Sequence, residues 1–165
     1  MSAKAEADRK EAWRRIVDRL HVARIHGCPA VNKPLMLLLI FSRAKKRGDN
    51  RFVFPELSTD IREALARFGP KHKGVSPALG FWHLQRDGFW ILHGLDRATL
   101  GPNQKAPTVT ALRDKHVYAT VRDDLWKELA EDSELTQELA NRIIHKFLSS
   151  QDQHAVAAFF GFSVQ

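Results

Sequence analysis

The sequence predicts a mainly α-helical, compact domain that carries one small β-hairpin. Apolar residues recur at the three- and four-residue spacing of amphipathic helices over most of the chain. Only two short runs, residues 89–92 and 118–121, are rich in the aromatic and β-branched side chains typical of strands. The length of 165 residues with 44% hydrophobic content suits one core, since single cores commonly form at about 100–200 residues. Residues 1–165 are therefore expected to form one domain.

Three helices are expected in the first part of the chain. The first spans residues 10–26 and carries its apolar residues on one face, Trp13, Ile16, Val17, Leu20 and Ala23, with arginines on the other. The second begins at Asn32-Lys33-Pro34, where proline suits a first turn, and runs to about Arg47. Its segment 35–41 is apolar all round, which predicts the central buried helix. The third begins near Pro55 and ends at Gly69-Pro70.

The second part begins with a basic loop over residues 71–77 and a short helix over residues 78–87, which Gly88 ends. The two strands are then expected to pair, with a long polar segment, residues 95–107, between them. Helices are expected at residues 123–130, at residues 151–160, and between them from an N-cap at Ser133 to Phe147.

Positive charge is concentrated in the larger, N-terminal part of the chain. Residues 1–122 carry 23 Lys/Arg and 11 Asp/Glu, a net charge of +12, whereas residues 123–165 carry 3 and 8, a net charge of −5. A basic surface attracts phosphate backbones, because each cation near a phosphate releases condensed counterions. The alternative is a solvated basic face that only aids solubility.

The motifs of the common enzyme and metal-site classes are absent from the sequence. His21, His26 and Cys28 match none of the usual zinc spacings, and neither a metal nor a cofactor is expected. His83 and Asp87 stand four residues apart on an expected helix and could form an acid–base pair. A small nuclease or hydrolase using these two residues is therefore the alternative enzymatic function.

A cytoplasmic location is expected. The first residues lack the apolar region of a signal peptide, and no apolar run reaches the roughly 20 residues that span a bilayer. The single cysteine agrees with a reducing compartment.

Three segments carry the side chains that a DNA-binding module needs. The basic loop supplies Lys71 and Lys73, and the second helix begins with Asn32-Lys33. The long polar segment contributes side chains that can read base edges: Arg97, Asn103, Gln104 and Lys105. An ordinary polar loop is the alternative for this segment, and a general helical DNA-binding domain is the alternative for the whole chain.

Two segments, Asn32-Lys33-Pro34 with the leucine-rich run after it and residues 79–90, carry a family resemblance. They resemble the sulfur-binding domain that precedes an HNH nuclease in bacterial type IV, modification-dependent restriction endonucleases. The family pattern is His/Asn-Lys/Arg-Pro before a leucine-rich helix, followed by aromatic-Pro-Phe-x-x-Leu-x-x-Asp-Gly-x-Trp. The resemblance covers residues 10–150, and it implies a non-catalytic DNA-binding domain that forms the N-terminal part of a longer nuclease.

The resemblance also implies a ligand and a site. The family binds double-stranded DNA in which sulfur replaces a non-bridging phosphate oxygen, and it holds that sulfur in a shallow apolar cavity. Carried over, the phosphate-binding positions fall on Asn32 and Lys33, and the cavity positions fall on Leu79, Gly80 and His83. This chain departs from the pattern where Leu79-Gly80 replaces the aromatic-Pro pair. The base-reading loop falls near residues 97–107, and Lys105 is its main candidate.

Base preference is expected to depend on Lys105. Lys105→Ala should relax discrimination at one base position by about 1–3 kcal/mol, because only contacts to base edges distinguish base pairs. Selection from randomised, modified duplexes measures this effect. A mutant that selects the same sequences as the wild type would remove Lys105 from this role.

Overall fold

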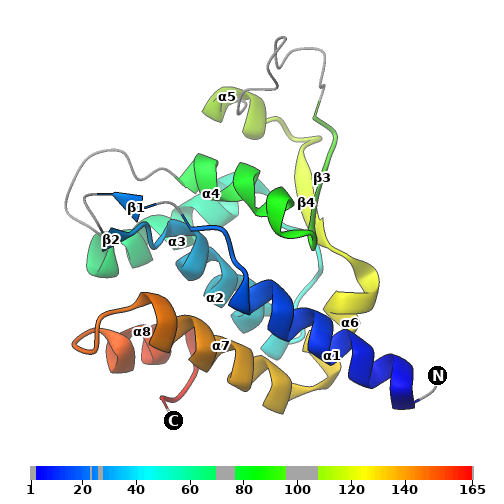
Figure 1. Cartoon of the computed structure of the whole chain (residues 1–165). Helices are drawn as coiled ribbons and strands as arrows, with labels where there is room; N and C mark the ends of the chain where they lie inside the picture. Colours follow the sequence, from blue (N-terminus) through cyan, green and yellow to red (C-terminus); the bar gives the residue numbers. More distant parts are fainter. Residues whose placement is uncertain (1–2, 23, 26–27, 70–76, 96–107, 165) are drawn as a thin grey trace.

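The computed structural model describes residues 3–22, 24–25, 28–69, 77–95 and 108–164 (Figure 1). The elements in the first part are α1 (Ala3–Asp18), β1 (Arg24–Ile25), β2 (Cys28–Pro29), α2 (Asn32–Lys45) and α3 (Phe54–Phe68). They are followed by α4 (Pro77–His83), the 3₁₀ helix η1 (Leu84–Asp87), β3 (Trp90–His93), α5 (Val109–Leu112) and β4 (Tyr118–Val121). The chain then forms α6 (Asp123–Glu131), α7 (Ser133–Phe147) and α8 (Gln153–Phe160).

The predicted fold class is confirmed, because helices dominate and β3 pairs with β4 in an antiparallel register that runs from Trp90↔Val121 to His93↔Tyr118. Phe52 adds a single bridge to Ala119. A second small pair, β1 with β2, was not predicted, since two-residue strands leave no alternation in the sequence.

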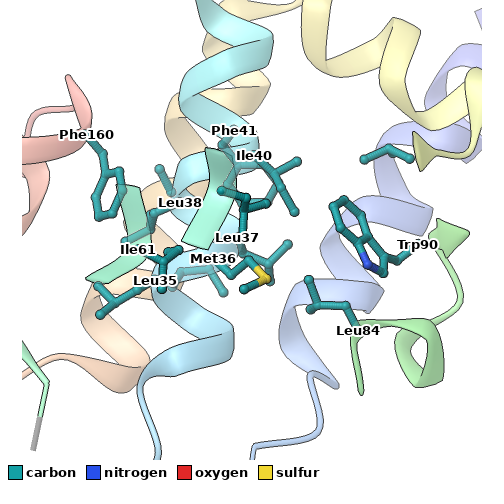
Figure 2. Packing of buried hydrophobic residues seen from close by; sticks show 14 of the residues in the cluster. Leu35, Met36, Leu37, Leu38, Ile40, Phe41, Ile61, Leu84, Trp90 and Phe160 are labelled. Carbon is teal, nitrogen blue, oxygen red and sulfur yellow. The ribbon is translucent and has the colours of Figure 1, made fainter. Parts of the chain in front are cut away.

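The core surrounds α2, as its uniformly apolar segment predicts. Figure 2 shows α2 passing through the cluster with Phe160 of α8 on one side and Trp90 of β3 on the other. Trp13 of α1 closes the cluster, where its ring meets Phe41 at 5.6 Å between centroids and its indole N–H donates to the Leu125 carbonyl oxygen at 2.8 Å. Burial of this kind contributes about 25 cal/mol per Å² of apolar surface, so α2 holds the elements together.

Two predicted helix starts and one predicted end were wrong. The first helix spans Ala3–Asp18 rather than residues 10–26. It begins early because its first residues are good helix formers, and beyond its end the backbone N–H of His21 donates to Asp87 rather than to a helical carbonyl oxygen. The N-cap of α7 is Asp132 rather than Ser133, and its carboxylate accepts the Leu135 N–H at 3.0 Å. The short helix α5, capped by Thr108, was not predicted.

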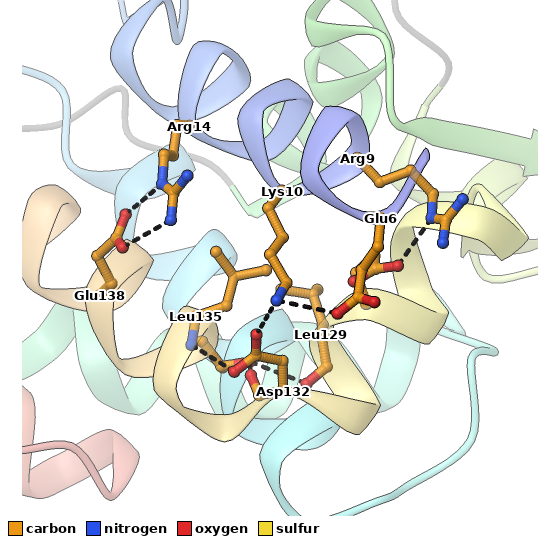
Figure 3. Close-up of polar contacts among 10 residues, drawn as sticks. Glu6, Arg9, Lys10, Arg14, Leu129, Asp132, Leu135 and Glu138 are labelled. Carbon is orange, nitrogen blue, oxygen red and sulfur yellow. Dashed lines mark hydrogen bonds and ion pairs between the residues drawn. The ribbon is translucent and has the colours of Figure 1, made fainter. Parts of the chain in front are cut away.

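The charge asymmetry along the chain is partly neutralised inside the fold. Three cations of α1 face three carboxylates of α6, α7 and the residue between these helices, as Figure 3 shows. Arg9 lies 2.7 Å from Glu128, Lys10 lies 2.9 Å from Asp132, and Arg14 lies 2.8 Å from Glu138. The basic face predicted for the first helix is therefore in part an internal contact surface rather than a free polyanion-binding surface.

These contacts lower the pKa values of two carboxylates. The Leu135 backbone N–H, aided by Lys10, holds the pKa of Asp132 below its ordinary value. Arg14 likewise holds the pKa of Glu138 below its ordinary value. Since a depressed pKa in the folded state means stabilisation of the charged form, both groups stabilise the fold above the unfolded-state pKa and cease to do so in acid.

Asp132→Ala is expected to lower the free energy of unfolding by about 1 kcal/mol at neutral pH, the usual cost of losing an N-cap. The difference from the wild type should shrink as the pH falls from the unfolded-state pKa of 3.8 through the lower folded-state pKa, because the wild-type carboxylate is then protonated in both states. Urea unfolding across a pH series measures both effects. Asp152→Ala is the matched control, since Asp152 stands at the N-cap of α8 without a capping bond. Equal losses in the two variants would contradict the assignment.

Candidate nucleic-acid interface

Asn32 and Met36 of α2 lie against Gly80 of α4, so the two segments that carry the family resemblance meet in space. A Cβ atom placed on Gly80 would lie 3.3 Å from the Met36 methyl and 3.6 Å from the Asn32 amide nitrogen. Gly80 therefore allows α4 to approach the N-terminal end of α2 closely. The sequence predicts Gly80 as a cavity position, and the structure shows that this glycine also has a packing role.

Lys33 is buried and paired. Its side chain is 9% exposed, and its ammonium donates to a carboxylate oxygen of Asp87 at 2.9 Å and to the His21 carbonyl oxygen at 2.7 Å. The sequence predicts Lys33 as a cation for DNA but indicates neither of these partners. An ammonium carries three N–H donors, so one remains for a ligand while both contacts persist.

Asp87, the last residue of η1, contacts both Lys33 and His21. Its side chain is 1% exposed, and its second carboxylate oxygen accepts the backbone N–H of His21 at 3.0 Å and lies 3.1 Å from His21 Nδ1. A buried carboxylate is stable only when it is paired and hydrogen-bonded, and Lys33 and His21 meet both requirements. One carboxylate thus joins the end of α1, the start of α2 and η1.

The acid–base pair between His83 and Asp87, the basis of the alternative enzymatic function, does not form in the structure. The α-helix ends at His83, and residues Leu84–Asp87 follow as a 3₁₀ helix with three residues per turn. The four-residue spacing therefore no longer places the two side chains on one face, and Asp87 turns to Lys33 and His21 instead. Gly88, in the left-handed region at φ 85°, ends this helix as expected.

His83 is held in an uncharged form near neutral pH. Its Nδ1 is buried and has no hydrogen-bond partner among the described residues. Burial, followed by the positive charges of Arg86 and Lys33, holds its pKa below the ordinary value of 6.5. A half-buried neutral imidazole beside Lys33 is suited to line a cavity of low polarity rather than to act as a phosphate-binding cation.

The other predicted site residues lie wholly or partly outside the described part of the structure. Leu79 belongs to α4 by its backbone, but its side chain lies outside the described part of the structure. Six candidates also lie outside it: Lys71, Lys73, Arg97, Asn103, Gln104 and Lys105. The structure thus brings together Asn32, Lys33, Gly80 and His83, and it adds Asp87 and His21.

The described part of the chain offers neither a cluster of metal ligands nor a membrane-spanning helix. In these residues, no three His, Cys, Asp or Glu side chains gather as metal ligands would. Nor does any helix among them have the length and apolar character needed to cross a bilayer.

Removal of the Lys33 ammonium should destabilise the domain because it leaves Asp87 buried beside fewer donors. We expect Lys33→Ala to lower the free energy of unfolding by about 2–3 kcal/mol, since the His21 contacts remain. Adding Asp87→Asn should restore part of that loss by removing the unpaired charge. Urea unfolding of both variants tests this, with exposed Lys46→Ala as the control that should change by less than about 0.5 kcal/mol. A Lys33→Ala loss no larger than that of the control would show that the pair does not stabilise the fold.

Several solved structures share the fold of this chain. The sulfur-binding domain of ScoMcrA complexed with phosphorothioated DNA has a TM-score of 0.77 at 23% identity, over 89% of this chain and 93% of that chain. That of SprMcrA, also complexed with phosphorothioated DNA, has a TM-score of 0.77 at 21% identity, over 94% and 96%. The type IV phosphorothioation-dependent restriction endonuclease ScoMcrA matches at a TM-score of 0.70 and 22% identity, over 87% of this chain and 28% of that chain.

At these sequence identities the structural similarity shows the fold alone. The family assignment comes from a sequence-family model. No curated protein matches the chain. The model of the ScoMcrA-like DNA sulfur-binding domain matches residues 10–165, which is nearly the whole chain. This chain therefore belongs to the family of ScoMcrA-like DNA sulfur-binding domains.

Proposed function

We propose that this domain recognises phosphorothioate-modified double-stranded DNA, holds the backbone sulfur in a shallow apolar cavity, and directs a linked HNH nuclease to that DNA in the bacterial cytoplasm. The observation that carries the proposal is the close approach of α4 to the first turn of α2. It brings Gly80 and His83 together with Asn32 and Lys33, the positions at which the family resemblance places the sulfur site. Membership in the sulfur-binding family supports the ligand.

The proposed cavity is formed by groups that favour sulfur over oxygen. Sulfur is larger, more polarisable and less strongly hydrated than oxygen, so a dry wall of carbon atoms accepts it and penalises an oxygen that loses hydrogen bonds. Met36 is fully buried beneath Gly80, with its methyl 3.3 Å and its sulfur 3.8 Å from the position of a Cβ atom built on the glycine, and it supports this wall from the core side. His83 adds a neutral ring.

The paired state of Lys33 reinforces this selectivity. Because Asp87 lies 2.9 Å from the ammonium, the two charges largely cancel at the site. An ordinary phosphate therefore gains little Coulomb energy there, while the remaining N–H of Lys33 still offers one hydrogen bond to a non-bridging atom. Rejection of oxygen then rests on the apolar wall rather than on a strong cation.

Other parts of the chain complete the proposed interface. Lys71 and Lys73 are assigned to phosphate contacts, and Arg97, Asn103, Gln104 and Lys105 are assigned to the reading of flanking bases. Cleavage is assigned to a separate HNH domain, because the similar restriction endonuclease ScoMcrA is much longer and the match covers only 28% of it. The domain itself then acts as the recognition module.

The deciding experiment compares matched duplexes with and without one backbone sulfur at about physiological salt, because affinities depend strongly on salt. We expect the sulfur duplex to bind roughly 10- to 100-fold more tightly, the equivalent of about 1.4–2.8 kcal/mol and within the cost of burying an unsatisfied polar group. Fluorescence anisotropy measures both dissociation constants. Equal dissociation constants for the two duplexes would show that the domain is a general DNA-binding domain without a preference for sulfur.

The cavity is tested by Gly80→Asn with Gly80→Ala as its control. Both variants add a Cβ atom 3.3 Å from the Met36 methyl, but only asparagine adds a polar amide that wets the apolar wall. We expect asparagine to bring the two dissociation constants together and alanine to keep most of the sulfur preference, with circular dichroism confirming that both fold. A folded Gly80→Asn variant with the wild-type ratio would place the sulfur elsewhere.

A further inference from the structure

His21 combines an exposed ring with a fixed orientation. Its side chain is 73% exposed, yet Nδ1 lies 3.1 Å from the buried Asp87 carboxylate, and its backbone N–H donates to the same oxygen at 3.0 Å. Its carbonyl oxygen accepts from Lys33 at 2.7 Å. An exposed histidine ordinarily samples several rotamers, whereas this ring is held from the backbone and from Nδ1 together.

The partner of Nδ1 decides what the other ring nitrogen can do. A carboxylate surrounded by N–H donors acts as an acceptor, so Nδ1 carries a proton. In the neutral ring Nε2 is then a lone-pair acceptor, and in the imidazolium Nε2–H is a donor. The exposed end of His21 thus becomes a cationic donor when it gains one proton.

We propose that His21 is a DNA phosphate contact at the rim of the sulfur site, with its imidazolium placed between Asp87 and a phosphate oxygen. This inference rests on the proposed function of the site. In this arrangement Nε2–H donates to the phosphate oxygen while Nδ1–H donates to Asp87.

The local charges favour this arrangement. Asp87 from η1 and Lys33 from α2 are the charged groups in hydrogen-bonding contact with His21, and they offset one another. Arg19 and Arg24 precede and follow it along the chain. An imidazolium therefore adds one net positive charge at the site, stabilised on one side by Asp87 and on the other by the phosphate.

A purely structural role accounts for the backbone contact but not for the ring. The backbone N–H of His21 already gives the Asp87 oxygen a donor, and the carbonyl already binds Lys33. Any residue other than proline can keep both of those contacts. The ring adds a second bond to the same oxygen while most of its surface faces solvent, which fixes the direction of Nε2.

The test uses His21→Ala, with His154→Ala in α8 as an exposed-histidine control. His21→Ala should weaken binding of the sulfur and oxygen duplexes alike by roughly 3- to 10-fold, because it removes one charge-assisted contact at an exposed rim. The slope of log affinity against log salt concentration should become shallower by about one unit. The ratio of the dissociation constants for the sulfur and oxygen duplexes should stay at the wild-type value. His154→Ala should leave all three quantities unchanged.

Nitrogen NMR of the imidazole rings supplies a readout that a structural role would not change. In the complex with the duplex, the His21 signals should show both ring nitrogens protonated, as expected of an imidazolium between Asp87 and a phosphate oxygen. Unchanged affinity and slope in His21→Ala, or a ring that stays singly protonated in the complex, would overturn the proposal. A wild-type sulfur-to-oxygen ratio near one would instead overturn the proposed function.

Discussion

The buried carboxylate of Asp87 is the contact on which the candidate site depends. It is 1% exposed and binds residues 54 and 66 positions away in the chain, Lys33 and His21. A charge at that depth requires partners, so the end of α1, the first turn of α2 and η1 must meet at one point. The motif Asp87-Gly88 and the motif Asn32-Lys33-Pro34 are thus two halves of one structural unit.

This constraint explains why the site differs from a simple basic patch. Lys33, the cation of the motif, is neutralised by Asp87, and three cations of α1 are paired with carboxylates of α6, of α7 and of the residue between them. Part of the charge asymmetry along the chain is therefore neutralised within the fold. What remains at the site is a close contact between α4 and α2, a neutral histidine and one spare ammonium donor, which together suit a poorly hydrated anion better than an ordinary phosphate.

Local sequence patterns predicted the parts of the fold that local interactions determine. The apolar run of α2, the aromatic and β-branched runs of β3 and β4, and the glycine after η1 each act within a few residues, and all three were predicted. The N-cap of α7 was misplaced by one residue because Asp132 and Ser133 are both good caps, and only the fold selects between them. The partners of Asp87 were missed because the prediction assumed one continuous α-helix through His83, and because Lys33 and His21 are distant in sequence.

Stability and recognition are coupled at most positions of this site but not at all of them. Gly80 separates α4 from Met36, a fully buried core residue, and Lys33 balances a buried charge, so changes at either position alter packing as well as ligand contacts. The ring of His21 lies on the solvent side of the same carboxylate, and its removal leaves both backbone contacts in place. On its buried side Asp87 pairs with Lys33, and this contact stabilises the fold. On its solvent side it holds the imidazole of His21, which leaves that ring accessible to DNA.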